Sequence, residues 1–274
     1  MTHRLLAVLV VLSLGTGATL AQESLSKERP KPAQKKAPVL ISKRVMSVGA
    51  HISYGIMMNG VSAFKLPSVP SCCPGYESTS GSGMVFGAEF ALPMSETFDL
   101  GARLVYQSSS TDFSSAEPVT VRAGNGVLKT DINHSFKTST SFLMIEPVAS
   151  IKLGGGLSMM AGLRVGTTLG GTYDQQEALA DPSIPYDFSS GSGLYNVKAG
   201  DIPNTSGLQA GALLGVRYAV PLSGGLSLMP EITYSPMFTD VVTDASWTIS
   251  PLRIGVGILF DIMSTETAST PIQP

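Results

Sequence analysis

The chain has 274 residues, of which 14% are charged, and its formal net charge is −2. This nearly neutral balance argues neither for a nucleic-acid partner nor for an acidic one. The mean hydropathy of +0.23 is high for a water-soluble protein. After the N-terminus, however, no apolar run approaches the ~20 residues that a membrane-spanning helix needs. A hydrophobic average without a hydrophobic helix favours a membrane-spanning β-structure.

Residues 1–21 have the features of a cleaved secretory signal peptide. Arg4 supplies a positive charge, residues 5–14 form a short apolar core, and Thr19 and Ala21 are small residues at the −3 and −1 positions of a cleavage site. The alternative is a single membrane anchor, but the apolar stretch is too short for one. We therefore expect export of the chain and cleavage after Ala21.

Residues 22–43 are rich in lysine and proline and poor in apolar residues. Such a segment has little surface to bury, so we expect an extended and mobile periplasmic linker. A basic tether to an anionic surface is the alternative to a simple spacer.

Cys72 and Cys73 are the only cysteines, and they are adjacent. Neighbouring cysteines can form a strained vicinal disulfide, pair between chains or stay reduced in an oxidising compartment. The sequence leaves their state open, and the simplest interpretation is a local loop feature without a catalytic role.

From residue 44 onward, apolar residues alternate with small or polar ones, with the period of two that is typical of β-strands. The alternation recurs in segments of about ten residues, the length that a tilted strand needs to cross a bilayer core. The segments are residues 46–56, 84–92, 98–107, 143–151, 157–169, 208–218, 228–235 and 252–261. We therefore predict an all-β fold, an eight-stranded antiparallel up-and-down transmembrane β-barrel over residues 44–262, followed by a short polar tail, residues 263–274.

The predicted connections alternate in length. Short turns are expected at residues 93–97, 153–156 and 221–225, and longer loops at residues 57–82, 108–138, 170–206 and 237–247. Outer-membrane barrels show this asymmetry, with the short turns in the periplasm. An even number of strands then places both ends of the barrel in the periplasm and the long loops outside the cell.

The orientation of the two strand faces decides between a membrane barrel and a soluble one, because a soluble lipocalin-type barrel also alternates but keeps its apolar side chains inside. Here the second face is rich in glycine, serine and threonine, which suit the crowded interior of a small barrel. It also carries charges of mixed sign. We expect this face to line the lumen, with arginines and carboxylates paired in a network; an ordinary solvated strand face is the alternative. The predicted network is Glu89, Asp99, Arg103, Glu146, Arg164, Arg217, Glu231, Arg253 and Asp261.

Aromatic residues assigned to the apolar face gather toward both ends of the strands. Tyr54, Tyr106, Phe142 and Tyr234 lie toward the long loops, and Phe90, Phe98, Tyr218 and Phe260 lie toward the short turns. Two aromatic girdles of this kind are expected where a barrel crosses the two membrane interfaces.

The last predicted strand resembles the β-signal of bacterial outer-membrane proteins. Arg253, Gly255, Ile258 and Phe260 have the polar, glycine and hydrophobic characters of that signal in the same order. The chain departs from many such barrels because it continues beyond the final aromatic residue.

Residues 44–262 as a whole resemble the OmpA-like family of outer-membrane β-barrel domains. The resemblance implies a location in the bacterial outer membrane, contact with outer-membrane lipid, and recognition by the barrel-assembly machinery during biogenesis. The tail, residues 263–274, is too short for the peptidoglycan-binding domain that follows the barrel in OmpA itself. We therefore expect no wall-anchoring role through such a domain.

Three functions are compatible with this sequence. The first is a barrel whose lumen is filled by the charge network and whose role is structural or lies in surface contacts of its long loops, with an unidentified partner. The second is a narrow or gated channel for small solutes. The third is a lipid-modifying enzyme that uses His51 with Ser53, or His134 with Ser135. A lone histidine on a lumen face is more often a hydrogen-bonded filler, so we expect no enzyme activity. We also expect no cofactor, metal or nucleic acid, and we assign no catalytic residue.

Overall fold

The computed structural model describes residues 40–62, 75–124, 126–188, 191 and 193–267. The predicted signal peptide, residues 22–39 of the predicted linker, Cys72 and Cys73 lie outside these ranges. No helix long and apolar enough to cross a membrane occurs in the part of the chain that the structure describes.

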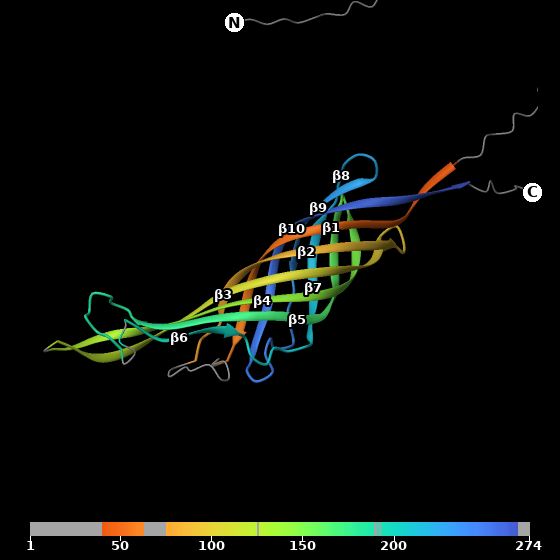
Figure 1. Ribbon diagram of the computed structural model, residues 1–274. Coiled ribbons are helices and arrows are strands. Elements are labelled where there is room, and N and C mark those ends of the chain that lie inside the picture. The colour runs from red at the N-terminus through yellow and green to blue at the C-terminus, as the bar shows by residue number, and fades with distance from the viewer. Residues whose placement is uncertain (1–39, 63–74, 125, 189–190, 192, 268–274) are drawn as a thin grey trace, which may run out of the picture. The chain divides into compact units, whose positions relative to one another are not determined.

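The regular structure of the described chain consists of β-strands (Figure 1). The strands are β1 (Leu40–Val61), β2 (Thr79–Pro93), β3 (Phe98–Ala123), β4 (Gly126–Gly154), β5 (Leu157–Leu179), β6 (Leu194–Asp201), β7 (Gln209–Tyr218), β8 (Val220–Pro221), β9 (Leu226–Tyr234) and β10 (Trp247–Thr267). They confirm the predicted all-β class.

Eight of these strands form a closed ring of antiparallel neighbours. The order around the ring is β1, β2, β3, β4, β5, β7, β9 and β10, and β10 pairs with β1 to close it. Because β1 and β10 pair with each other, neither strand is left with a free edge of unpaired backbone groups. A sheet surrounded by lipid requires this pairing, since lipid cannot form hydrogen bonds with such groups. The predicted eight-stranded antiparallel barrel is therefore confirmed. The short strands β6 and β8 lie outside the ring and pair with β5 and β9.

The short turns lie where the sequence predicts them. Residues 94–97 join β2 to β3, residues 155–156 join β4 to β5, and residues 222–225 precede β9. Gly154, Gly155 and Gly156 have φ angles of 102°, 57° and 88°. Side chains of L-residues rarely adopt these angles, so glycine permits the tight reversal here.

The predicted loop over residues 108–138 is wrong over almost its whole length, and the predicted loop over residues 170–206 is wrong over about half of it. β3 and β4 run on as a continuous ladder to the turn at Gly124, and β5 continues to Leu179 with β6 beside it. The prediction identified strands by an apolar outer face. Beyond the bilayer the outer face of a strand meets water, so Ser, Thr, Asp and Lys replace the apolar residues without ending the strand.

We refer to this projecting part, residues 111–123, 126–138, 172–179 and β6, as the outer sheet. Figure 1 shows β3, β4 and β5 continuing past the ends of their neighbours at one end of the barrel, with β6 alongside. At the opposite end, β1 begins at Leu40 and β10 ends at Thr267, so both strands extend past the predicted range of 44–262.

Side-chain exposure establishes which face lies outside. Leu104, Val165 and Ile254 are 52%, 45% and 60% exposed, whereas the preceding residues Arg103, Arg164 and Arg253 are at most 2% exposed. The apolar face is therefore the outer surface and the charged face is enclosed, as predicted. The same alternation holds around the ring, because successive side chains of a strand point to opposite faces.

Most of the predicted girdle residues lie on the outer surface. Tyr54, Tyr106, Tyr234, Phe90, Tyr218 and Phe260 are exposed, and Phe98 is half-buried. The placement of Phe142 in the girdle is wrong, because Phe142 is 3% exposed and points into the barrel. Its neighbour Leu143 faces outward, and alternation then turns Phe142 inward.

Candidate functional site

The middle of the lumen holds a network of arginines and glutamates, with one residue from each of seven ring strands. Each of the seven side chains is more than nine-tenths buried. We call this group the central network: Glu89 (β2), Arg103 (β3), Glu146 (β4), Arg164 (β5), Arg217 (β7), Glu231 (β9) and Arg253 (β10).

Strand register explains why these residues meet. Glu89 lies directly opposite Arg103, Arg103 lies opposite Glu146, and Arg217 lies opposite Glu231. Directly opposed residues on one face of an antiparallel pair have neighbouring side chains, and opposite charges there attract. In a closed narrow barrel, side chains from distant strands then meet across the lumen.

Two arginines and two glutamates form one half of the central network. Arg103 contacts Glu89 at 3.0 Å and Glu231 at 2.7 Å, and Arg217 contacts the same two carboxylates at 2.6 and 2.8 Å. Both Arg103 with Glu231 and Arg217 with Glu89 use two guanidinium nitrogens. Such paired contacts fix geometry as well as charge.

Glu146 is the centre of the other half. Its carboxylate contacts Arg164 at 2.8 Å and Arg253 at 2.9 Å. Arg164 also donates a hydrogen bond of 2.9 Å to the side-chain oxygen of Gln107, and Arg253 donates one of 3.0 Å to Thr233. The two guanidinium groups are thus paired with one carboxylate and with neutral oxygen atoms.

Asp99 and Asp261, the other two predicted network residues, lie apart from the central network at the short-turn end. Asp99 contacts Arg44 at 2.6 Å and Lys152 at 2.9 Å, and Asp261 accepts a hydrogen bond of 2.5 Å from Ser47. We call Arg44, Lys152, Asp99 and Asp261 the rim cluster.

Arg44 and Lys152 are not among the lumen residues that alternation predicted. Lys152 follows the outward-facing Ile151, so alternation alone could have found it. Arg44 and Met46 are two residues apart, so simple alternation predicts that Arg44 points outward, as Met46 was predicted to do. A register shift between Arg44 and Met46 turns the side chain of Arg44 to the inner face instead, and simple alternation does not anticipate such an irregularity.

A cavity of about 510 Å³ lies at the short-turn end and is bordered by the rim cluster and by the central network. We call it the vestibule. Glu89, Arg103 and Arg217 border it, together with the buried apolar residues Val148, Met229 and Leu259.

The long-loop end of the lumen is closed by apolar side chains, which we call the apolar plug. Within the described chain its buried members are Met57, Tyr76, Val85, Val105, Phe113, Phe136, Phe142, Met144, Tyr173, Ile202, Val241, Val242, Trp247 and Ile249. Trp247 is fully buried, and its indole nitrogen donates a hydrogen bond of 2.9 Å to Asn59. Asn59 in turn donates one of 2.9 Å to Thr111, so the indole of Trp247 and the amide of Asn59 are both paired inside the plug.

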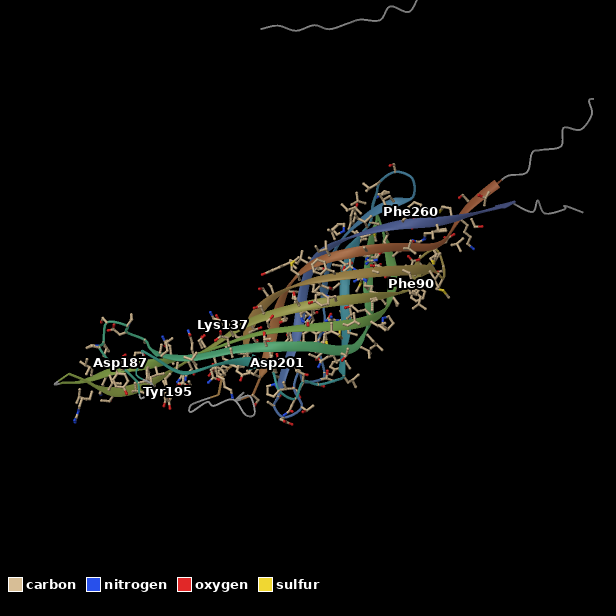
Figure 2. All side chains as sticks on the ribbon, in the orientation of Figure 1. Phe90, Lys137, Asp187, Tyr195, Asp201 and Phe260 are labelled. Atoms are coloured by element: carbon tan, nitrogen blue, oxygen red, sulfur yellow. The ribbon has the colours of Figure 1, made fainter. Side chains whose placement is uncertain are left out.

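The inner face of the outer sheet continues the plug with stacked aromatic rings. The ring of Phe136 lies 5.4 Å from that of Tyr76 and 5.8 Å from that of Tyr173, between centroids. Farther along, Phe188 stacks on Tyr195 at 5.4 Å. Figure 2 labels Lys137, Asp201, Tyr195 and Asp187 along this projecting part, and Phe90 and Phe260 toward the other end of the barrel.

The two histidines of the enzyme hypothesis lie in different surroundings. His51 is 5% exposed, and within the described part of the chain neither ring nitrogen has a hydrogen-bond partner. His134 lies in the outer sheet, with Glu177 3.4 Å from Nδ1 and Glu117 3.5 Å from Nε2. Neither histidine forms a hydrogen bond with Ser53 or Ser135 in the described contacts. Across the described ranges, no group of three or more His, Cys, Asp or Glu side chains is placed to hold a metal ion.

The residues that resemble a β-signal are divided between the two faces of β10. Arg253 belongs to the central network, and Gly255 lies against Ser53 and the backbone of Ile52. Ile258 and Phe260 are 50% and 48% exposed on the outer surface. Recognition of this strand by the assembly machinery stays a prediction.

A closed ring of antiparallel strands with an apolar exterior, aromatic residues toward its ends and a charged interior is a transmembrane β-barrel. No family model matches the chain, and no curated protein sequence matches it either. Membership of the OmpA-like family therefore stays a prediction.

Several solved structures resemble the chain at low identity. Ail, the attachment invasion locus protein of Yersinia pestis, is 10% identical with a TM-score of 0.34, over 80% of this chain and 100% of Ail. Neisserial surface protein A is 12% identical with a TM-score of 0.35, over 79% of this chain and 97% of that one. A major outer membrane protein from Thermus thermophilus is 16% identical with a TM-score of 0.31, over 78% of this chain and 99% of that one. The fold assignment rests on the strand ladder and on side-chain exposure, and not on these likenesses.

Proposed function

We propose that this chain is an outer-membrane β-barrel with a closed lumen, whose role is structural or lies in surface contacts made by the outer sheet. The observation that carries the proposal is that two separate groups of side chains, the central network and the apolar plug, block the lumen. The predicted export signal and the short-turn asymmetry support the outer membrane as its location.

The central network opposes conduction because opening it separates buried charges. Removing one partner from a buried ion pair typically costs about 3–5 kcal/mol, and each glutamate of the central network contacts at least two arginines. A path through the lumen would also have to displace the fully buried Trp247. The channel alternative requires both rearrangements together.

The outer sheet supports a surface role. Its strands are joined by cross-strand ladders, with one irregularity between Gln175 and Glu177 in the β5–β6 pair, so it holds a defined form beyond the bilayer. Its outer face carries exposed polar residues such as Asp112 and Lys137, which suit contact with water or with another macromolecule. Lipid around the barrel and the assembly machinery during biogenesis are the other expected partners; nucleic acid is not expected, and neither is enzyme activity.

Conductance of planar bilayers tests the proposal. We expect no discrete current steps from purified wild-type barrel, under conditions in which a large porin conducts. The Trp247→Ala variant should also be silent, because the central network closes the lumen independently of the plug. Regular single-channel steps from the wild type would reject the closed-lumen function and favour the channel.

A further inference from the structure

The half of the central network around Glu146 holds more positive than negative charge. Arg164 and Arg253 share the carboxylate of Glu146, at 2.8 and 2.9 Å. Among the described residues, no other carboxylate lies within 4.0 Å of Arg164 or Arg253. Ionised groups held away from bulk water are normally paired, so one further negative charge would be stabilised in this half.

A small cavity, which we call the inner cavity, lies between Arg164 and the apolar plug. Its lining consists of Gln107, Phe142, Met144, Arg164, Gln209, Met237 and Ile249. Arg164 is the one charged residue in this lining, and no carboxylate borders the cavity. An anion would therefore meet an attractive charge here and no repelling one, whereas a cation would meet the reverse.

Two N–H groups at the inner cavity are available to an occupant. Arg164 contacts Glu146 through Nε and Gln107 through Nη2, which leaves Nη1 without an acceptor in the described chain. Gln107 receives that bond on its side-chain oxygen, and its amide nitrogen has no acceptor among the described residues either. Arg164 and Gln107 are 1% and 3% exposed. Buried donors without a partner cost free energy, so an occupant that accepts hydrogen bonds would be held here.

The neighbouring polar groups are already paired with one another. Gln209 donates a hydrogen bond of 3.0 Å to the backbone carbonyl of Asp240 and accepts one of 3.4 Å from Thr239. The carboxylate of Asp240 accepts the backbone N–H of Trp247 at 2.8 Å, and Asp240 does not line the inner cavity. Gln209 and Asp240 therefore do not supply the acceptor that Arg164 and Gln107 lack.

The inner cavity has room for one small ion. Its volume is about 10 Å³, close to that of one water-sized sphere. A carboxylate or a phosphate is too large for this space. Met144 and Met237 have flexible, unbranched side chains that adapt to an occupant slightly larger than water. The occupant is therefore a monatomic ion or a single water molecule.

We propose that the inner cavity binds a single chloride ion. The ion accepts hydrogen bonds from Nη1 of Arg164 and from the side-chain amide of Gln107, and its charge balances the second cation beside Glu146. A water molecule would accept the same hydrogen bonds but would leave that charge unbalanced. This inference goes beyond the proposed function and does not depend on whether the barrel conducts.

Bromide replaces chloride in such sites, and its anomalous X-ray scattering distinguishes it from water. Crystals of the wild-type barrel grown with bromide as the only halide should show an anomalous peak in the inner cavity, within hydrogen-bonding distance of Arg164 and Gln107. Bromide peaks confined to the protein surface, or a water molecule in the inner cavity without anomalous signal, would overturn the proposal.

Urea unfolding tests the binding in solution. Chloride is exchanged for gluconate at constant ionic strength, because gluconate is too large for the inner cavity. A ligand that binds only the folded state lowers the unfolding equilibrium constant in proportion to its concentration, once that concentration exceeds the dissociation constant. We therefore expect each tenfold increase in chloride above this point to lower the constant about tenfold. Equal stability of the wild type in chloride and in gluconate would reject the site.

Two glutamine variants sharpen the test. Gln107→Glu places a carboxylate beside Arg164 and should remove the chloride dependence, because it supplies the missing negative charge. Gln176→Glu is the matched control, since it makes the same change at an exposed position of the outer sheet, and it should keep the dependence in full. Chloride dependence that persists in folded Gln107→Glu barrel would place the ion elsewhere and reject the site. If Gln107→Glu does not fold, the bromide measurement on the wild type decides between ion and water.

Discussion

Glu146 is the residue on which half of the central network depends. It is fully buried and contacts Arg164 at 2.8 Å and Arg253 at 2.9 Å, with Arg103 at 3.9 Å. Charges in such a site are held by one another and not by water, so the loss of one member leaves the others uncompensated. By contrast, Asp112 and Lys137 form a pair whose side chains are more than 60% exposed, and water screens that pair.

The Glu146→Gln variant tests this difference. We expect its free energy of unfolding to fall by about 3–5 kcal/mol, because two guanidinium groups lose their shared carboxylate. Urea titration of the fluorescence of Trp247, the only tryptophan, reports the loss. Asp112→Asn is the matched control and should change the free energy by less than about 1 kcal/mol. Equal stabilities of the two variants would contradict this account.

Among the strands, the seam between β1 and β10 closes the ring and depends on close backbone approach. A methyl group added at Gly255 would overlap the hydroxyl of Ser53 and the carbonyl oxygen of Ile52. Two residues farther along the same strand, a methyl group at Gly257 would have its nearest neighbours at 3.5 Å, an ordinary contact distance. The space around the two glycines therefore differs, although their neighbours in the sequence are nearly the same.

We predict that Gly255→Ala lowers the yield of folded barrel severalfold, whereas Gly257→Ala leaves it near that of the wild type. Heat-modifiable migration on gels measures the folded fraction. Refolding into lipid vesicles without assembly factors separates the two possible causes: a defect there reports strain in the seam, and a defect confined to cells reports failed recognition. Normal folding of Gly255→Ala in vesicles and in cells would contradict both explanations, strain in the seam and failed recognition.

The inner face of the outer sheet is packed by a cluster of aromatic rings. Phe136 is 1% exposed and lies among Tyr76, Phe113 and Tyr173. Phe113 also contacts the ring of Trp247 at 6.0 Å between centroids, so the rings are continuous with the rest of the apolar plug. Nearer the short turns the barrel wall is held by the central network instead, so disturbance of the rings should act mainly on the outer sheet.

Truncation of this aromatic stack tests that separation. Phe136→Ala should lower the free energy of local opening of the outer sheet by about 3–5 kcal/mol, the usual cost of removing a buried Phe side chain. Hydrogen exchange of the β3 and β4 amides measures this opening. Val127→Ala, at a position that is 64% exposed, should have little effect. Equal loss of protection throughout the barrel ladder in Phe136→Ala would show that the two parts open together.

The barrel as a whole is asymmetric along its axis. Short turns and the rim cluster lie at one end, and the outer sheet and the apolar plug lie at the other. Outer-membrane barrels place their short turns in the periplasm. The vestibule would then open toward the periplasm, and the outer sheet would face the exterior.

Cysteine labelling in a Cys72→Ser, Cys73→Ser background tests the orientation. A membrane-impermeant maleimide should label the Asn133→Cys variant in intact cells, because residue 133 is exposed on the outer sheet. The Ser95→Cys variant, in a short turn, should react only after the outer membrane is permeabilised. The reverse pattern would show that the barrel is inserted in the opposite sense.

Local sequence patterns were enough to predict the strand-based architecture and the sidedness of the barrel. Successive side chains of a strand point to opposite faces, so the period-two pattern around Arg103, Arg164 and Arg253 separates inside from outside without any long-range information. The short turns could be found for a similar reason, since glycine clusters and breaks in the pattern are local features.

The three-dimensional structure was needed to establish which enclosed charges meet, how far the strands continue, and where the lumen stays open. Glu146 contacts Arg253 because a closed ring brings β4 and β10 together across a narrow lumen. Arg44 turns inward because of a register shift that alternation does not encode. The length of β3 and β4 beyond the bilayer depends on cross-strand pairing in water, and the vestibule depends on volumes that several strands leave unfilled together. These properties arise from contacts between residues distant in the chain, which a local pattern does not specify.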